Sequence, residues 1–561
     1  MSRTQSSLRR LRGNHSSGLN QQMAAFQSVA VGVAEVESGQ LREAKHANPM
    51  PESHLVAGEI KKLFYHSSHY LAGLMAKLGL GFISLPIFAR VFSVADYGLI
   101  DFAQKILLLM TALSKLGLQN SALRFFDGQE YVTNLQAKRR YYSTMFFGSA
   151  LSSTTVAIIF LAFSSFFLKS RIDAPLAVLM GFIAVLTVLK ALESMLWSFM
   201  RVEERTKAYN VWSVVIKAMA IGTVCFLLPV LGRSPQTYFT GTTIAEIAVV
   251  AMLGFFLFRR GVLDPSRLDP GLLRAGLLFG SPLIIYEIAS IVLDSGDRVL
   301  VRHYLGAEPL GLYSVAYGLS AQVNELLIFP LSLAIFPIYM RLWRSQGPEA
   351  TASFLSTCLD VFLATAAGVC ALSVVTSNDA VTLLASQKYR GAEQLIPFVV
   401  AGLLVYTTHI FLCAGLLIHK KTGTMALLLL CSAALNIGMN VVLLPRMGLV
   451  AAALATLVSY VFCILLLGFA SVRLLPLKIR FLELARYLFA AGVVAFGVSK
   501  VELKLPVVNL GVRAALTVVL YLGLLYLLDG RVREVARSIL HRLRKPADFS
   551  RDAAGVATPS D

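Results

Sequence analysis

Charged residues are scarce in this 561-residue sequence: Asp, Glu, Lys and Arg together make up 15% of it. Soluble globular proteins carry about 25% charged residues and roughly 45–50% apolar ones. Hydrophobic residues reach 56% here, so the composition indicates an integral membrane protein. The net charge of +19 does not indicate nucleic-acid binding, because most Lys and Arg lie in short segments between apolar runs, as in the cytoplasmic loops of membrane proteins. We expect a lipid bilayer as the partner, and no nucleic acid.

Cysteine is scarce as well, and the common nucleotide-binding and catalytic motifs are missing. The six cysteines all fall inside apolar runs and none forms a CxxC pair, which argues against a disulfide framework and a cysteine-based metal site. The sequence has no GxxxxGK(S/T) motif, so ATP is not expected to be the direct energy source, and it has no GxSxG, HExxH or loop DxD motif. We therefore expect a transporter with no cofactor, no metal and no catalytic residue.

Long apolar runs begin only after residue 62. Residues 1–62 lack the apolar stretch of about 7–15 residues that a signal peptide needs, and they predict a disordered cytoplasmic tail. A membrane span needs about 20 mostly apolar residues. Such runs predict about fourteen spans, at 68–90, 98–118, 142–168, 174–199, 210–231, 238–258, 274–296, 308–336, 353–376, 393–417, 424–445, 449–472, 482–499 and 507–528. The predicted parts are a first bundle (63–262), a cytoplasmic linker (263–275), a second bundle (276–474), two additional helices (475–530) and a basic cytoplasmic tail (531–561).

The distribution of Lys and Arg predicts the orientation of these spans. With the N-terminus inside, the inner loops and the C-terminal tail hold about 25 of them and the outer loops about 11, and positive charge stays inside. An even number of spans then places both termini in the cytoplasm, as expected for a multi-pass protein of the cell inner membrane. The longest outer connection, 377–392, is too short for a folded outer domain.

The spans contain an internal repeat. Arg205-Thr206 and Leu227-Leu228-Pro229 bracket the fifth span, and Lys421-Thr422 and Leu443-Leu444-Pro445 bracket the eleventh in the same way. GLIDFA at 98–103 likewise aligns with GLYSVA at 311–316. Because six spans per unit is an even number, the two units have the same orientation and are parallel repeats about an axis along the membrane normal. We predict an all-α membrane protein with two parallel six-helix repeats around a central cavity, plus two extra helices.

Polar and charged side chains inside the spans are candidates for this cavity. A charge in the hydrocarbon core costs at least about 2.5–3.5 kcal/mol, so it usually faces a protein interior or a wet cavity. Positions three, four and seven apart share a helix face, and several spans carry polar stripes with that spacing. The candidate cavity or gate residues are Arg90, Asp101, Gln104, Glu193, Glu287, Asp294, Asp297, Arg298, Tyr313, Tyr317, Asn324, Glu325, Asn436 and Asn440.

Lysines are concentrated in the first bundle. A cluster of ammonium groups suits a diphosphate, because each is a compact phosphate-binding charge. The candidate diphosphate-binding residues are Lys77, Lys105, Lys190 and Lys217. Structural interpretations remain open for individual residues: Asp101 with Lys105, and Lys190 with Glu193, have the spacing of pairs along one helix. Lys115 lies near a helix end, where its side chain could extend to the membrane surface.

Three segments carry a resemblance to a known family: FARVFSVADYGLIDFAQ at 88–104, DRVLVRHYLGAEPLGLYSVAY at 297–317 and NVVLLPRMGLVAAALATLVSY at 440–460. They resemble the polysaccharide-export flippases, the O-antigen translocase (Wzx-like) branch of the superfamily that also holds multidrug and toxic compound extruders and lipid II flippases. The resemblance covers roughly residues 65–530 and implies a V-shaped transporter of twelve or fourteen helices. It also implies a polyprenyl-diphosphate-linked oligosaccharide as substrate, carried from the cytoplasmic to the outer leaflet for surface polysaccharide biosynthesis.

The resemblance and the in-span charges together predict alternating access. We expect Lys77, Lys105, Lys190 and Lys217 to neutralise the diphosphate, and Asp294, Asp297 and Arg298 to close an outer gate or carry a coupling ion, H⁺ or Na⁺. Polysaccharide polymerase and chain-length proteins are candidate partners. The alternatives are a multidrug or cation antiporter of the same fold, a membrane glycosyltransferase or polymerase, and a sugar porter, although the 258–274 linker is short for the last of these.

Overall fold

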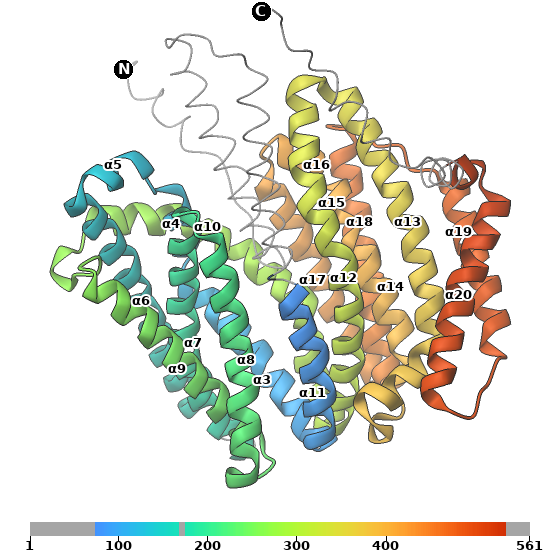
Figure 1. The fold of residues 1–561 in the computed structure, drawn as a ribbon, viewed down its shortest axis with the longest axis horizontal. Coiled ribbons are helices and arrows are strands. Elements are labelled where there is room, and N and C mark those ends of the chain that lie inside the picture. The colour runs from blue at the N-terminus through green and yellow to red at the C-terminus, as the bar shows by residue number, and fades with distance from the viewer. Residues whose placement is uncertain (1–72, 74, 168–173, 535–561) are drawn as a thin grey trace, which may run out of the picture. The chain divides into compact units, whose positions relative to one another are not determined.

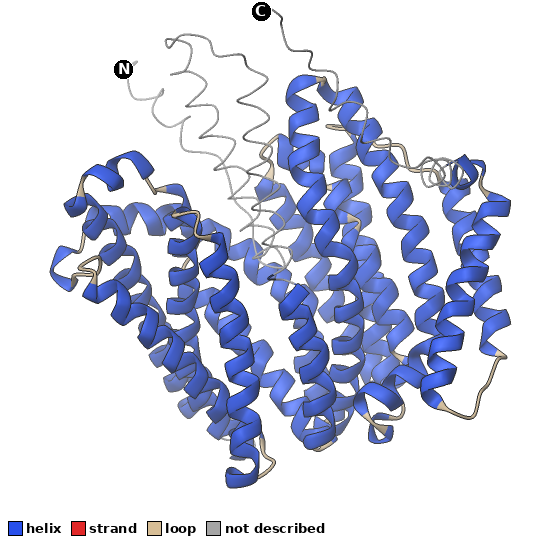
Figure 2. Ribbon diagram, in the orientation of Figure 1, coloured by secondary structure: helices blue, strands red, loops and turns tan. Residues whose placement is uncertain are grey.

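The computed structural model describes residue 73, residues 75–167 and residues 174–534. These residues fold entirely into helices and connecting loops, with no strand anywhere in the described part (Figures 1 and 2). The predicted tail at 1–62 and most of the predicted C-terminal tail lie outside the described residues. The prediction of an all-helical protein is therefore confirmed.

The helices of the first predicted bundle begin with a helical segment at 75–91. The others are α3 (Val94–Lys115), α4 (Leu118–Arg124), α5 (Gly128–Thr133), α6 (Leu135–Phe167), α7 (Ala174–Val202), α8 (Thr206–Leu231) and α9 (Pro235–Arg259). Ser93 caps α3 by accepting a hydrogen bond from the Asp96 amide, and Ser234 caps α9 in the same way, just before Pro235. Both arrangements are typical helix starts, since the cap satisfies an amide that has no partner within the helix.

The helices of the second predicted bundle are α10 (Pro270–Ser295), α11 (Asp297–Leu305), α12 (Ala307–Ser345), α13 (Gly347–Ala380), α14 (Ile396–Thr407), α15 (His409–Leu412), α16 (Ala414–Ile418), α17 (Thr422–Met447) and α18 (Leu449–Val472). The additional helices are α19 (Phe481–Ser499) and α20 (Pro506–Leu528). The predicted tenth span is therefore broken into the three helices α14 to α16. A loop with a π-helical turn (Val381–Ala385) connects α13 to α14.

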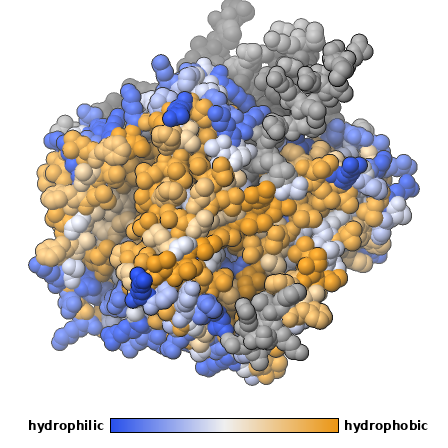
Figure 3. Space-filling view, turned by 180° about the vertical axis from the view of Figure 1, so that it is seen from behind, coloured by the Kyte–Doolittle hydropathy of each residue, from blue (hydrophilic) through white to orange (hydrophobic). Residues whose placement is uncertain are grey.

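Helices occupy every position where the sequence predicts a span. The first predicted span, 68–90, starts outside the described residues. Eleven helices in the described ranges are long and apolar enough to cross a membrane, or twelve if Pro270–Ser281 and Leu283–Leu305, which bend by 42°, form one span. The helix at 75–91 and α12 occupy the remaining predicted positions. Figure 3 shows hydrophobic residues over the middle of the visible face and hydrophilic residues gathered towards its top and bottom, as a bilayer requires.

The internal repeat is visible in the backbone before α8 and α17. Glu204 and Lys420 both adopt the left-handed conformation, with φ of 54° and 57°. The next amide closes the same turn in each copy: Arg205 N–H donates to the Met200 carbonyl, and Lys421 N–H donates to the Leu416 carbonyl, both at 2.8 Å. Two non-glycine residues in this uncommon conformation at matching positions confirm the repeat predicted from short sequence identities.

The repeats meet through matched glycines on α3 and α12. A Cβ atom on Gly98 would lie 2.6 Å from the Gly311 nitrogen and 2.7 Å from the Ala307 carbonyl oxygen, and one on Gly311 would lie 2.0 Å from the Val94 carbonyl oxygen. These residues occupy equivalent positions in the two repeats, so the contact is nearly self-complementary, as in a two-fold interface. Only glycine allows the two helix backbones to approach this closely.

The described residues form two compact units. One comprises the described residues up to 356 together with 380–478, and it holds the first repeat and the second repeat except for the middle of α13. The other comprises 357–379 and 479–534. Within this second unit, the middle of α13 packs against α19 and α20 around a core that includes Ala371, Val494 and Tyr521. Two ion pairs support it: Arg480 lies 2.8 Å from Asp360, and Arg513 lies 3.4 Å from Asp379.

Candidate functional site

A buried ion-pair network joins the two repeats on the predicted outer side, where α3 starts and α10 ends. The Arg298 Nε donates to Asp101 Oδ2 of α3 at 3.1 Å, and its Nη1 lies 3.3 Å from Asp297 Oδ1. The Arg298 side chain is only 1% exposed and lies 4.2 Å from the centre of the Tyr317 ring. Ser314 adds a 2.8 Å hydrogen bond to Asp101. Ser314 and Asp101 occupy equivalent positions in the two repeats, so the network lies beside the contact between their glycines.

The network continues into the second repeat through Asp297. Its Oδ2 accepts hydrogen bonds from the Tyr313 hydroxyl and, at 3.1 Å, from Thr456 of α18. The Thr456 hydroxyl in turn accepts a 3.4 Å hydrogen bond from Asn436 of α17, and Asn440 donates to the Asn436 side chain at 3.2 Å. All of these side chains are buried. The structure thus brings together candidates that the sequence placed on three separate spans.

Asp294 is the third acidic residue at this end of the bundles. Its Oδ1 is 3.4 Å from the Tyr317 hydroxyl and 3.3 Å from the Tyr460 hydroxyl. Its backbone carbonyl accepts a 2.9 Å hydrogen bond from Arg298. These contacts lie within the second repeat and position Arg298, whose bond to Asp101 can hold the two repeats together and must break if they are to separate on this side.

Lys190 is paired with two carboxylates. Its Nζ lies 3.0 Å from Glu193 Oε2, one turn along α7, and 2.7 Å from Glu246 Oε2 on α9. The ion pair with Glu193 is the one that the spacing along one helix predicts. Glu246 is not among the predicted site residues. The sequence feature that could have identified it is its position as a lone acidic residue in the middle of the apolar run 238–258. Because Lys190 is already compensated, it differs from the other predicted diphosphate-binding lysines.

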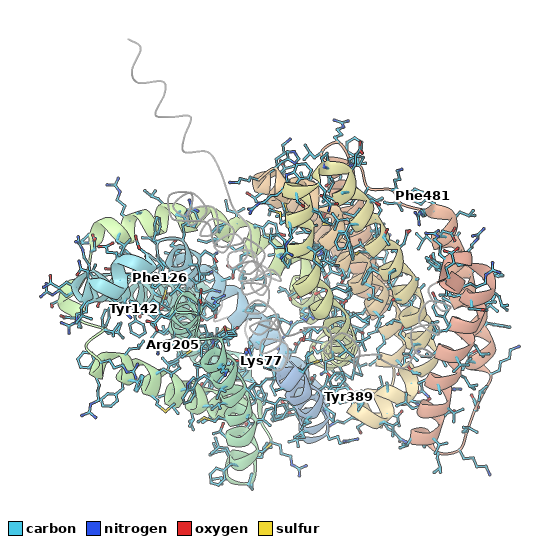
Figure 4. The ribbon with its side chains drawn as sticks, turned by 45° about the horizontal axis from the view of Figure 1, so that its top comes forward. Lys77, Phe126, Tyr142, Arg205, Tyr389 and Phe481 are labelled. Atoms are coloured by element: carbon cyan, nitrogen blue, oxygen red, sulfur yellow. The ribbon has the colours of Figure 1, made fainter. Side chains whose placement is uncertain are left out.

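Lys77, Lys105 and Lys217 have unused hydrogen-bonding capacity. Lys217 donates at 3.0 Å to the Lys77 carbonyl, and the Lys77 ammonium lies 5.2 Å from the centre of the Tyr209 ring. Lys105 is half-buried on α3 and has no direct ion pair or hydrogen bond within the described ranges. No carboxylate of the described residues lies within ion-pair distance of any of the three. Figure 4 labels Lys77 on the helical segment 75–91.

The remaining candidates connect neighbouring helices. Gln104 donates to the Tyr238 hydroxyl at 2.5 Å, and Asn324 accepts from Thr407 at 3.1 Å. Glu287 of α10 forms a 3.1 Å ion pair with Lys115 of α3, and both side chains are 3% exposed. Lys115 therefore points into the protein, not towards the membrane surface.

Arg90 lies on the predicted outer side, at the end of the first helical segment. Its guanidinium donates to the Leu383 carbonyl. Lys388 from the same connecting loop of the second repeat donates back to the carbonyls of Arg90, at 3.1 Å, and Phe92, at 2.5 Å. Burial and the nearby Arg233 lower the pKa of Lys388. Tyr389, labelled in Figure 4, packs its ring edge-on against Tyr97. This loop thus binds the first repeat reciprocally.

A second polar cluster lies at the opposite, predicted cytoplasmic ends of α6 and α7. Glu203 accepts a 2.7 Å hydrogen bond from Tyr142 and lies 3.0 Å from Lys138 and 2.8 Å from Arg205. Figure 4 labels Tyr142 and Arg205. Burial alone would raise the pKa of Glu203, but the hydrogen bonds from Tyr142 and Lys138 and the charge of Arg205 hold it below its usual 4.5. This cluster fastens the loop between α7 and α8.

Comparison with solved structures identifies the fold. The structure is similar to that of the lipid II flippase MurJ in an inward closed conformation, with a TM-score of 0.63 and 13% identity, covering 82% of this chain and 98% of that one. It is also similar to an inward-facing multidrug resistance MATE family transporter of the MOP superfamily, with a TM-score of 0.54 and 12% identity, covering 72% and 97%. The described part of the chain therefore has the same fold as these two proteins.

Sequence comparison finds a matching family. Residues 65–343 match the family described as "Polysaccharide biosynthesis protein". It is also 22% identical over 286 residues to the succinoglycan biosynthesis transport protein ExoT of Rhizobium meliloti (strain 1021). That alignment spans 50% of this chain and 54% of the relative, about half the length of each. The resemblance noted in the sequence is confirmed.

Proposed function

We propose that the protein is a flippase that moves a polyprenyl-diphosphate-linked oligosaccharide from the cytoplasmic to the outer leaflet by alternating access. The observation that carries the proposal is that the two repeats differ in how their buried basic residues are paired. The first holds three lysines, Lys77, Lys105 and Lys217, without ion-pair partners in the described part of the chain, whereas Arg298 in the second is fully paired. Unpaired ammonium groups at bilayer depth are costly unless they serve a hydrated site.

The substrate follows from the chemistry of these lysines. Ammonium groups bind phosphate oxygens through charge-assisted hydrogen bonds, and a diphosphate offers several such oxygens. An organic cation would be repelled by the same groups. We therefore assign the diphosphate to Lys77, Lys105 and Lys217. Lys190 stays part of the site, with Glu193 and Glu246 as its resident counter-charges.

The transport step is rocking of one repeat against the other. In the proposed cycle, the pair between Asp101 and Arg298 and the loop that carries Lys388 hold the outer side closed while substrate enters from the cytoplasm. Separating the repeats on the outer side breaks both contacts and opens the site to the outer leaflet. Asp294 and Asp297 are the proposed carriers of a coupling ion, H⁺ or Na⁺, and one charge moved across 100 mV supplies about 2.3 kcal/mol.

The test is a double substitution, Lys105→Ala with Lys217→Ala, in the full-length protein reconstituted in vesicles. The readout is the fraction of a fluorescent polyprenyl diphosphate oligosaccharide that a membrane-impermeant quencher reaches over time. We expect the double variant to lose most of the flipping rate. Lys504→Ala is the matched control, because Lys504 is exposed in the loop before α20. Wild-type flipping by a correctly inserted double variant would reject the proposed site.

A multidrug or cation antiporter is the second candidate, supported by the similarity to the MATE transporter fold. The same vesicles distinguish it. An antiporter would move a labelled organic cation in response to an ion gradient and leave the lipid-linked oligosaccharide in place.

A further inference from the structure

Glu325 lies on the face of α12 that contacts the first repeat. Along this face, Ser314 bonds to α3, and Gln322 donates to the Gly81 carbonyl at 3.3 Å. Gly318 between them lies so close to Leu85 that an added Cβ would be 3.1 Å from it. Glu325 follows Gln322 by three residues, so both lie on the same side of the helix. The register therefore directs Glu325 towards the helical segment 75–91.

Lys77 lies on this segment of the first repeat, and Lys217 of α8 reaches it. The Lys217 ammonium would lie 3.2 Å from a Cβ on Gly81, the residue whose carbonyl Gln322 binds, and it donates to the Lys77 carbonyl one turn away. Lys217 and Lys105 attract the Glu325 carboxylate electrostatically, and Asp294 repels it. The Glu325 carboxylate thus faces the proposed diphosphate site from the opposite repeat.

Glu325 also differs from the other acidic candidates. Asp101, Glu193, Glu246, Glu287, Asp294 and Asp297 each have a direct hydrogen-bond or ion-pair partner. Glu325 is exposed and has no such partner within the described ranges. Its charge is attracted by the lysines across the interface but is not fixed to any of them. A carboxylate in this position can approach the lysines or withdraw from them as the repeats move.

We propose that Glu325 is the exchangeable counter-charge of the diphosphate site, which offsets part of the positive charge of Lys105 and Lys217 whenever the diphosphate does not. The inference rests on the proposed function. A flippase must return between transport events with its phosphate-binding lysines unoccupied, and their charges then need a partner as the repeats close. Glu325 supplies that partner, so it competes with the substrate, weakens its binding and speeds both its release and the return step.

The experiment compares wild type, Glu325→Gln and Glu325→Asp in purified full-length protein. Binding is measured with geranyl diphosphate as a soluble probe, and flipping with the fluorescent lipid-linked oligosaccharide. We expect Glu325→Gln to bind the probe at least about tenfold more tightly and to flip at least about tenfold more slowly, because bound diphosphate is no longer displaced. Glu325→Asp, which keeps the charge, should remain near wild type. Glu308→Gln, at the start of the same helix, is the matched control.

Opposite changes in affinity and rate are the specific signature, since a merely structural defect would weaken binding and flipping together. Unchanged or weaker binding by Glu325→Gln would overturn the inference. If that variant does not insert, Glu325→Ala carries the same expectation. Adding Lys217→Ala should abolish the gain in affinity, and a gain that persists would also overturn the inference. Failure of the proposed function gives a different result: the wild type itself would not bind geranyl diphosphate in a manner that depends on Lys105 and Lys217.

Discussion

Replacing Asp101 with Asn tests whether the ion pair with Arg298 holds the predicted outer side closed. The substitution keeps the shape of the side chain but removes its charge. The two hydrogen bonds from Arg298 Nε and the Ser314 hydroxyl, at 3.1 and 2.8 Å, then lose their ionised acceptor. Arg298 keeps its contact with Asp297, so its buried charge is still compensated.

The expected magnitude follows from these contacts. A hydrogen bond to a charged group is worth about 1.5–3 kcal/mol. Leaving a buried charge without any partner costs about 3–5 kcal/mol, and this larger value does not apply because Asp297 remains. In the outer-open state, water takes the place of Asp101 as the hydrogen-bond partner of Arg298. We therefore expect the substitution to destabilise the closed state by about 1.5–3 kcal/mol relative to the open state. At 1.4 kcal/mol per factor of ten, the open fraction should rise about 10- to 150-fold.

The assay labels a cysteine at position 89 with a membrane-impermeant maleimide. Ala89 is fully buried, and it lies one turn from Leu85, which contacts Gly318 of α12. We expect Asp101→Asn to accelerate labelling of Ala89→Cys at least about tenfold. Asp96→Asn is the matched control, because Asp96 bonds locally to Ser93 at the start of the same helix. Equal labelling rates in Asp101→Asn and its parent would refute the role of this ion pair in closure.

Two further predictions concern stability. The folded-state pKa of Glu203 is lowered, so its ionised side chain stabilises the protein fully above the usual pKa of 4.5, and this contribution is lost as the pH falls through the folded-state pKa. The difference in Tm between wild type and Glu203→Gln should therefore be present at about pH 6 and shrink below pH 4.5. A difference in Tm that does not depend on pH would contradict this prediction. Gly311→Ala should destabilise the folded protein by about 1–3 kcal/mol, because the added methyl group overpacks against α3, and the Tm should fall. Gly438→Ala is the control: the space around its Cβ position is open, so the Tm should stay nearly unchanged.

The fold was largely predictable from the sequence. The apolar runs of spanning length became helical, the tenth as three short helices, because a chain in lipid must satisfy its backbone hydrogen bonds internally. The repeat was predictable for a related reason. Matching turns need matching backbone conformations, and the Arg205-Thr206 and Lys421-Thr422 pairs mark turns of the same geometry.

The partners within the candidate site were less predictable. The pairing of Lys190 with Glu193 follows from helical spacing, and the structure has it. Asp101 had an equally well-spaced partner in Lys105, yet it binds Arg298 from the other repeat. Glu246 was missed because it stands alone in its span, with no polar stripe around it.

The sequence by itself determined that the chain crosses a membrane many times, that it is built from two parallel copies of one unit, and which face of each helix is polar. Helical periodicity is sufficient for this, because it fixes how side chains are arranged around their own helix axis. Only the tertiary structure decided which polar faces meet: Arg298 with Asp101, Glu287 with Lys115, and Glu325 opposite Lys217. These placements depend on the rotation and depth of one helix against another, which are set by close packing such as that of Gly98 on Gly311. No local pattern in the sequence encodes them.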